Sequence, residues 1–355
     1  GIRDSSASRG LGDVYKRQYL HYTGVGAIPH TMANPDLTWQ TTKKLNVGIT
    51  SSLFNDRLNV NFDYYNEVTD DMLIDISLPP SSGVTTVKSN YGSQESNGVE
   101  FSLWGKIIDS RDWEWNLSVN GLHSKTTIKN ISEALKRQNE ENASKNETAA
   151  PLLQYREGES PTAIYAVRSA GIDPASGQEI YIKKDGTYTY SYNVEDMMNV
   201  GDTNPWMQGS LSSYLSYKQF ALNVNFSYRF GGDLYNSTRM AKIENVNPQR
   251  NVDIRAFTER WHQAGDVVPY LDISATGGKA YIYSDRFVEK DNELWLSNVN
   301  LQYNVPDECV KKFGLQKLYV GVGMEDLFRL TTAKYERGTS YPYSRSVNFS
   351  LSVTF

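Results

Sequence analysis

A short tyrosine-rich segment has side chains of the right type and spacing to bind a ligand. Tyr188, Tyr190 and Tyr192 alternate along the chain, and alternate residues of a β-strand point to the same face. Aromatic rings on one face form a platform on which a sugar ring stacks. The competing interpretation is that the rings pack the segment against a neighbouring loop or a partner protein. We assign no ligand-binding residue from the sequence alone.

Clustered carboxylates offer a second kind of chemistry, the coordination of a cation by oxygen ligands. Asp70 and Asp71 are adjacent, and Asp75 follows shortly after them. The alternative is a solvated strand end, where acidic side chains face water and bind nothing. Asp173 in the segment GIDPASG has the position of a turn cap, because aspartate accepts hydrogen bonds from the backbone that follows it. None of these residues is assigned as a site.

Catalytic chemistry finds no support in the sequence. His123 lies beside Ser124, but neighbouring residues of a strand point to opposite faces. No Gly-x-Ser-x-Gly segment is present. The four histidines lack the His-Glu-x-x-His spacing, and the single cysteine, Cys309, excludes an internal disulfide framework and a cysteine metal cluster. The sequence therefore predicts no catalytic, cofactor-binding or metal-binding residue, no cofactor and no enzyme.

The elements that position these side chains are predicted to be β-strands. Apolar residues alternate with polar ones in about ten segments, which is the period of a strand with one apolar and one polar face. The polar partners are mostly Asn, Ser and Thr, which suits a water-filled interior. Several segments reach the length of about 10 residues that a membrane-crossing strand needs. The clearest alternating runs are 45–49, 58–64, 99–103, 113–119, 220–230, 318–322 and 347–355.

The connections between these strands are of two kinds. Short turns are predicted at 55–56, 110–112 and 218–219, whereas long polar stretches occupy 75–96, 129–161 and 232–287. Short turns at one end and long loops at the other are typical of an outer-membrane barrel, with the turns periplasmic and the loops extracellular. A secreted soluble β protein is the alternative that periodicity alone leaves open.

Local structure is also predicted inside the long connections. Residues 177–192 place Asp185-Gly186 between two β-rich arms, which is a strong signal for a hairpin turn. Residues 130–146 are rich in Glu, Lys and Asn, and both a short helix and a mobile loop fit that composition.

Composition limits the class of protein. The formal net charge of −5 lacks the basic footprint of a nucleic-acid-binding protein. Apolar residues make up 39% of the chain, and no apolar run approaches the about 20 residues of a transmembrane helix. A membrane-crossing strand does not need such an apolar run, because only every second one of its residues is apolar. The chain contains 24 Tyr, 12 Phe and 7 Trp, several near predicted strand ends, as aromatic girdles require.

The first residues differ from the rest of the chain. Residues 1–18, GIRDSSASRGLGDVYKRQ, have neither the apolar core of a signal peptide nor a strand or helix period. Reverse translation gives in-frame sequences that resemble DNA-sequencing library adapters, with Ser5-Ser6-Ala7 in the place of a sample index. We therefore predict that residues 1–18 are translated adapter and that native sequence begins at about Tyr19. A natural basic N-terminal tail is the alternative.

A set of longer segments carries a more specific signal. They are LTWQTTKKLNVGITSSLFNDRLNV and its continuation (37–73), LPPSSGVTTVKSNYGSQESNGVEF and its continuation (78–108), AGIDPASGQEIYI (170–182), 200–236, ERWHQAGDVVPYL (259–271), LWLSNVNLQYNVP (294–306) and YPYSRSVNFSLSVTF (341–355). Together and in this order they resemble SusC/RagA-type TonB-linked outer-membrane proteins of Bacteroidetes. Trp39-Gln40 stands where the family often has Trp-Glu, and residues 325–328 read Glu-Asp-Leu-Phe where Gln-Asn-Leu-Phe is common.

The resemblance implies an all-β fold: residues 19–355 form the C-terminal part of a large antiparallel transmembrane β-barrel with long extracellular loops and short periplasmic turns. Family barrels resemble the 22-stranded plugged type, and their plug, TonB box and N-terminal domain would lie upstream. The terminal Phe355 fits the family's signal for barrel assembly. An open sheet in lipid leaves backbone groups unpaired, so this portion alone is expected not to insert as a functional barrel.

The function implied by the resemblance is active import across the outer membrane. A TonB-dependent receptor of this type takes up oligosaccharides or peptides, is energised by the TonB complex and is capped by a SusD-like surface lipoprotein. The other partner is outer-membrane lipid, faced by residues such as Val347, Phe349 and Leu351, with Asn348, Ser350 and Ser352 facing the lumen. A passive porin or an adhesin barrel is the alternative, and an outer-membrane protease or lipase barrel is a further one.

The origin of residues 1–18 is testable in the source DNA. We expect long reads across the codon of Tyr19 to lack the adapter-like sequence. Upstream of that codon the reading frame should continue into a plug domain, a TonB box and a signal peptide. A genomic reading frame that encodes GIRDSSASRGLGDVYKRQ would contradict the adapter interpretation. A native start just upstream of Tyr19 would favour a small unplugged barrel.

Overall fold

A computed structural model describes residues 17–21, 24–28, 32–78, 80–84, 86–145, 148–247, 249, 251–275, 281–312, 314–334 and 345–354. Residues 1–16 of the predicted adapter segment and the terminal Phe355 lie outside these described residues. Two short strands, β1 (Arg17–His21) and β2 (Gly24–Ile28), pair with each other.

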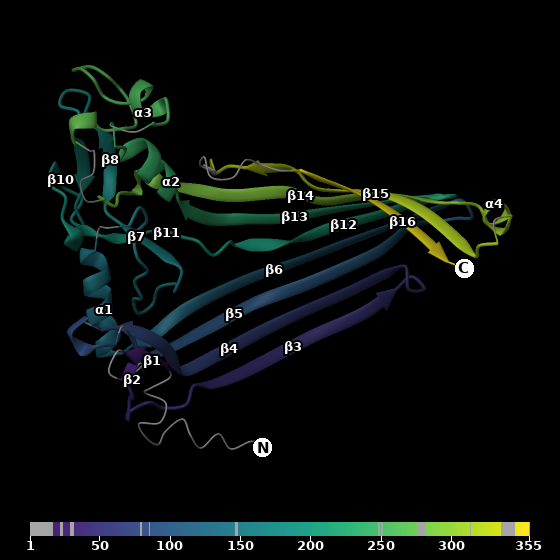
Figure 1. The fold of residues 1–355 in the computed structure, drawn as a ribbon, viewed down its shortest axis with the longest axis horizontal. Coiled ribbons are helices and arrows are strands. Elements are labelled where there is room, and N and C mark those ends of the chain that lie inside the picture. The colour runs from purple at the N-terminus through teal and green to yellow at the C-terminus, as the bar shows by residue number, and fades with distance from the viewer. Residues whose placement is uncertain are drawn as a thin grey trace.

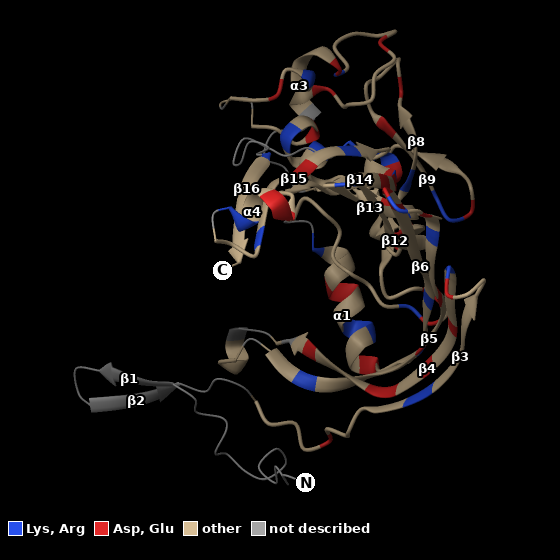
Figure 2. Ribbon diagram, turned by 90° about the vertical axis from the view of Figure 1, so that its right-hand side faces the viewer, with Lys and Arg blue, Asp and Glu red and all other residues tan. Residues whose placement is uncertain are grey.

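The fold is dominated by one antiparallel sheet of nine strands in the order β16-β15-β14-β13-β12-β6-β5-β4-β3. Strand neighbours are mostly sequence neighbours, and the sheet curves into a trough (Figures 1 and 2). The strands are β3 (Thr41–Leu53), β4 (Leu58–Ser77), β5 (Thr86–Asp109), β6 (Trp113–Ile131), β12 (Met207–Tyr217), β13 (Phe220–Tyr235), β14 (Val288–Asn304), β15 (Lys317–Thr331) and β16 (Ser346–Thr354). This architecture confirms the predicted antiparallel β-barrel wall.

The predicted short turns are present at one end of the sheet. Lys218 adopts a left-handed conformation with φ of 51° in the two-residue turn between β12 and β13, and Asn55 and Asp56 do the same between β3 and β4. Asn and Asp tolerate this conformation better than other non-glycine residues. The helix α4 (Asp307–Lys311) connects β14 to β15 at this same end (Figure 1).

The predicted long loop at residues 75–96 is wrong. Strands β4 and β5 instead continue through it, with the pairing maintained as far as Ser77 opposite Thr86, and only the short 3-10 helix η2 (Pro80–Ser82) lies between them. The 24 residues of β5 exceed the about 9–11 residues that cross a bilayer. The outer part of this hairpin therefore stands beyond the membrane, where no apolar face is needed and alternation fades from the sequence.

The two faces of the sheet differ in chemistry along rows of directly paired residues. The outer face is mainly apolar, as in the row Leu58, Gly105, Leu117, Ser213, Val224, Val299, Met324 and Val347. The inner face is mainly polar, as in the row Asn59, Trp104, Ser118, Ser212, Asn225, Asn298 and Glu325. On β16, Phe349 is 80% exposed on the outer face and pairs with Val322, whereas Ser350 pairs with Gly321 on the inner face. The predicted lipid-facing and lumen-facing sets of this strand are confirmed.

Two polar side chains on the outer face have partners within the sheet. The Trp115 indole N–H donates to the Ser213 hydroxyl at 3.0 Å, and the Tyr228 hydroxyl donates to the Asn120 carbonyl at 2.8 Å. Lipid supplies no hydrogen-bond partner, so an unpaired donor here would cost several kcal/mol. The Tyr228 side chain crosses Gly209 of β12 to reach the Asn120 carbonyl, and a Cβ at Gly209 would lie 2.7 Å from the Tyr228 hydroxyl. Glycine at this position therefore permits the contact.

The long connections 132–206 and 236–287 form a compact cap at the other end of the sheet (Figure 1). Their buried side chains share one apolar core that includes Val167, Tyr181, Met197, Ile243 and Phe287. The elements of the cap are α1 (Glu133–Ser144), β7 (Ala163–Ala166), β8 (Arg168–Ile172), β9 (Glu179–Ile182), β10 (Tyr188–Thr189), η3 (Val194–Asp196), β11 (Met198–Asp202), α2 (Ser237–Arg239), η4 (Met240–Glu244), α3 (Arg255–Thr258), η5 (Ile273–Ala275) and η6 (Asp285–Phe287).

Two local predictions concern this cap. Residues 133–144 form the helix α1, which begins where the Ser132 side chain accepts a hydrogen bond from the Leu135 N–H, an N-cap that satisfies one of the free donors of the first turn. Leu135 is fully buried, so packing fixes the helix. The predicted hairpin is confirmed as β9 and β10, with Gly186 in the turn at φ of 86°. None of the helices in the described residues has the length and apolar character of a membrane span.

The difference between the two faces predicts the effect of a new charge at the middle of β12. Leu211 lies on the outer face between Val119 and Phe226, and the next residue, Ser212, lies on the inner face. In the complete receptor refolded into lipid vesicles, Leu211→Arg should lower the free energy of unfolding by about 2–4 kcal/mol. Ser212→Arg is the matched control and should leave it nearly unchanged. Equal losses in denaturant titrations of the two variants would contradict the assignment of the faces.

Candidate ligand-facing surface: the inner groove and the outer cap

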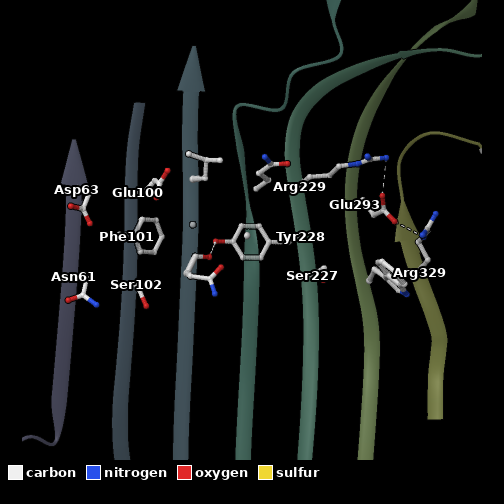
Figure 3. Close-up of a pocket in the computed structure, with 16 residues that line it drawn as sticks. Asn61, Asp63, Glu100, Phe101, Ser102, Ser227, Tyr228, Arg229, Glu293 and Arg329 are labelled. Atoms are coloured by element: carbon white, nitrogen blue, oxygen red, sulfur yellow. Dashed lines mark hydrogen bonds and ion pairs between the residues drawn. The ribbon is translucent and has the colours of Figure 1, made fainter. Parts of the chain in front are cut away.

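A groove of about 840 Å³ crosses the inner face of the sheet. It reaches from β4 to β15, and its polar side chains rise from adjacent strands (Figure 3). The inner-face residues that line it are Asn61, Asp63, Glu100, Ser102, Asn120, Leu122, Gln208, Ser227, Arg229, Glu293, Trp295 and Arg329. We call this surface the inner groove.

The two ends of the inner groove differ in charge. At one end Asp63 and Glu100 are directly paired across β4 and β5, an arrangement of like charges that is unfavourable unless water or a cation screens it. At the other end Glu293 lies between the guanidinium groups of Arg229 and Arg329 (Figure 3). Between these ends the lining is mostly neutral amides and hydroxyls. The groove is therefore a polar, hydrated surface with an acidic end and an end of mixed charge.

Trp295 contributes an aromatic ring to the inner groove. The guanidinium of Arg329 lies 4.9 Å from the centre of the Trp295 ring, a stacking geometry that holds both groups in place. Hydrogen-bonding amides and hydroxyls beside a fixed aromatic ring can bind a polar solute without any covalent chemistry. Among the described residues, no group of His, Cys, Asp and Glu side chains is placed to hold a metal ion.

The cap is held together by a buried ion cluster between the two long connections. The Arg286 guanidinium donates to both carboxylate oxygens of Glu179 at 2.8 Å and to Glu244 at 2.8 Å. Burial alone would raise the pKa of Glu179, but the charge of Arg286 and the hydrogen bonds to the carboxylate together outweigh burial and hold that pKa below its usual range. The two carboxylates in turn raise the pKa of Arg286. The cluster ties β9 to η4 and η6.

A second arginine secures the same region through backbone carbonyls. Arg260 is 1% exposed, and its guanidinium donates to the carbonyls of Ala256 and Leu271 at 2.8 Å and of Glu244 at 2.7 Å. Ala256 and Glu244 lie in the short helices α3 and η4, and Leu271 lies in irregular chain. The last carbonyls of a helix have no partner within it, so they need another donor. Arg260 therefore replaces a regular hydrogen-bond ladder.

The predicted tyrosine platform is only partly present. Tyr188 and Tyr190 are 69% and 54% exposed on the cap, but Tyr192 packs edge-on against Tyr181 with ring centres 5.6 Å apart. Strand β10 ends at Thr189, so the alternation that would place all three rings on one face does not continue. The Tyr190 hydroxyl donates to Asp173 at 3.0 Å. For Tyr192 the packing interpretation holds.

The predicted aspartates do not come together as a cation site. Asp70 pairs with Lys43 at 3.6 Å and Asp75 with Lys88 at 3.1 Å, while Asp71 adopts a left-handed conformation with φ of 53°. The alternative of solvated strand residues therefore holds.

Asp173 caps a turn, as predicted. Its carboxylate accepts from the Ala175 N–H at 3.0 Å and from the Ser176 hydroxyl at 2.6 Å. These local hydrogen bonds fix the chain after β8, and together with the Tyr190 hydroxyl they lower the pKa of Asp173.

His123 and Ser124 are not a catalytic pair. They are consecutive residues of β6, and the His123 ring contacts the Trp206 carbonyl and ring instead. The charged residues of the inner groove were not predicted from sequence. The sequence signal for these charges was Arg229, a charged residue between two aromatic residues of the outer face, Tyr228 and Phe230. The partner of Arg229 on β14 depends on the strand register, so the sequence alone does not identify it.

These features define the class of protein. A curved antiparallel sheet with an apolar outer face, a polar inner face, short turns at one end and a large cap at the other is the wall of an outer-membrane β-barrel. Comparison with known proteins agrees. The family model described as "TonB dependent receptor-like, beta-barrel" matches residues 5–156. That match begins inside the segment 1–18, whose predicted adapter origin remains a prediction.

Relatives and solved structures point the same way. TonB-dependent receptor P3 of Formosa agariphila is 26% identical over 86% of this chain and 31% of its own length. TonB-dependent receptor SusC of Bacteroides thetaiotaomicron is 34% identical over 24% of this chain and 9% of its own length. The RagAB peptide importer in its closed-closed state matches 96% of this chain and 38% of its own with a TM-score of 0.77 at 24% identity, which shows the shared fold.

The chain is similar to TonB-dependent receptors of the outer membrane, SusC among them. It spans about a third of the length of the relatives that match along most of it. This family is one of TonB-dependent receptors rather than a class of enzymes.

The ion cluster predicts how the cap responds to substitution and to pH. Arg286→Met leaves Glu179 and Glu244 buried without their cation, which should cost about 3–5 kcal/mol and make the cap sensitive to limited proteolysis at neutral pH. Arg137→Met, an exposed arginine of α1, is the control and should have no effect. Proteolysis of the complete receptor in membranes measures both.

The sign of the pH dependence follows from the lowered pKa of Glu179. In the unaltered protein the stabilisation is complete above pH 4.5, the ordinary value, and is lost as the pH falls through the lower folded pKa. In Arg286→Met the burial of Glu179 is no longer offset by a cation, so its pKa should rise and protease resistance should recover as the pH falls. Resistance that is equal in the two proteins at every pH would contradict this role of the cluster.

Proposed function

We propose that the complete protein is an energised importer of the outer membrane, and that this chain supplies part of its barrel wall, lumen surface and extracellular cap. The observation that carries the proposal is the division of one sheet into an apolar outer face and a polar inner groove of about 840 Å³. The family supports TonB as the energy source. Residues 19–355 would form the barrel portion, with a plug domain and TonB box upstream.

The substrate class proposed is oligosaccharides or peptides. Neutral amides and hydroxyls beside Trp295 in the inner groove suit both, since each presents many hydrogen-bonding groups and weakly polar surfaces. The solved RagAB structures are titled as a peptide transporter and a peptide importer. A SusD-like surface lipoprotein is the proposed partner on the outer side, where the cap lies.

The energy source separates an importer from a passive porin. In cells that express the complete receptor, uptake of an oligosaccharide or peptide nutrient should fall to background when TonB is deleted. Radiolabelled uptake is the measurement. Uptake that continues without TonB would support the porin alternative instead.

The inner groove predicts a matched pair of substitutions on β13. Ser227 lines the groove, and the preceding residue, Phe226, points to the outer face. Ser227→Trp should lower TonB-dependent uptake several-fold because the indole occupies part of the groove, whereas Phe226→Trp should leave it unchanged. Normal transport in Ser227→Trp cells with normal receptor levels would remove the groove from the proposed route.

A further inference from the structure

A second pocket lies outside the inner groove, where the outer ends of β14 and β15 meet the cap. It has a volume of about 470 Å³, and its charged lining consists of Arg239, Arg255, Lys290, Lys334, Glu259 and Glu289. We call it the mouth pocket. The inner groove has two arginines and three carboxylates in its lining, so the mouth pocket is the more cationic of the two.

The floor of the mouth pocket is fixed by hydrogen bonds. The Arg239 Nε donates to the Tyr270 hydroxyl at 2.9 Å, and its guanidinium also pairs with Glu289. The other oxygen of Glu289 accepts from the Lys334 backbone N–H at 2.8 Å. Tyr270 is 2% exposed, so Arg239 is anchored on a buried residue and its position does not depend on a ligand.

Two of the other three cations, Arg255 and Lys290, pair with carboxylates that do not line the pocket. Asp253 accepts two hydrogen bonds from Arg255, at 2.9 and 2.7 Å, and Asp233 pairs with Lys290 at 2.7 Å. An ammonium has three N–H donors, so the single carboxylate of Asp233 does not use all the donors of Lys290. The supporting carboxylates lower the repulsion among the cations, and Lys290 keeps donors for a further acceptor.

Converging cationic donors on a fixed floor are the chemistry that binds an oxyanion. A neutral hydroxyl would gain less from these donors, because charge-assisted hydrogen bonds are about twice as strong as neutral ones. The mouth pocket therefore suits a carboxylate or a sulfate ester better than any uncharged group.

We propose that the mouth pocket binds an oxyanion group of the incoming ligand, a carboxylate or a sulfate ester, before the ligand enters the barrel. The proposal rests on the proposed import function and adds to it a preference for acidic ligands. Lys290 and Lys334 lie at the rim, where Lys290 has 71% of its side chain exposed, and they are the first groups that such a ligand would meet.

Equilibrium binding to the purified complete receptor in detergent tests this proposal. The probes are two pairs that differ only in charge: trigalacturonic acid with its methyl ester, and tetra-alanine with its C-terminal amide. The acidic member of at least one pair should bind more tightly. The double variant Lys290→Gln/Lys334→Gln should weaken that binding by about tenfold and leave the neutral member unchanged.

The control is the double variant Lys183→Gln/Lys184→Gln, which removes the same charge from exposed lysines of the cap outside the mouth pocket. Equal loss in the control, equal binding of the acidic and neutral members, or no binding of either acid would overturn the proposal. The pair that responds identifies the source of the oxyanion, an acidic glycan or a peptide. Binding needs no TonB, so the two proposals fail in different measurements. If the import proposal fails, uptake loses its dependence on TonB while the binding affinities of the mouth pocket are unchanged.

Discussion

The structure depends on one constraint, the pairing of every backbone N–H and C=O group that lies in lipid. Each unpaired group in the bilayer core costs several kcal/mol, and the nine-stranded ladder satisfies these groups strand by strand. Within this sheet, as the described residues form it, β3 and β16 are the two strands that pair on one side alone. In a membrane those two edges need further strands, which fits a chain about a third as long as its relatives.

The same constraint explains how the two faces and the cap differ. Inside the membrane the ladder fixes the alternation, so apolar residues face lipid and polar ones face the inner groove. Even the Trp115 indole on the outer face has a partner in Ser213. Beyond the membrane the chain becomes irregular, and buried arginines replace the ladder. Arg260 satisfies backbone carbonyls there, and Arg286 joins two loops through their carboxylates.

Sequence reasoning succeeded where the bilayer imposes a period and failed where it does not. The strands around 45–64 and 220–230 and their short turns were predicted because lipid demands alternation. The outer halves of β4 and β5 were missed because water accepts polar residues on both faces. The charges of the inner groove were missed as a group because Arg229 meets Glu293 only through the register of β13 and β14. The mouth pocket joins segments that are distant in sequence, so no local pattern predicts it.

The central claim is that one face of this sheet contacts lipid and the other contacts water. Spin labels placed one at a time at residues 222 to 227 of β13, in a Cys309→Ser background, test it in the complete membrane-embedded receptor. Collisions with oxygen, which dissolves in lipid, should be high at even positions, and collisions with a water-soluble nickel complex should be high at odd ones. Uniform accessibility along the strand, or the opposite alternation, would contradict the assignment of this sheet as a barrel wall.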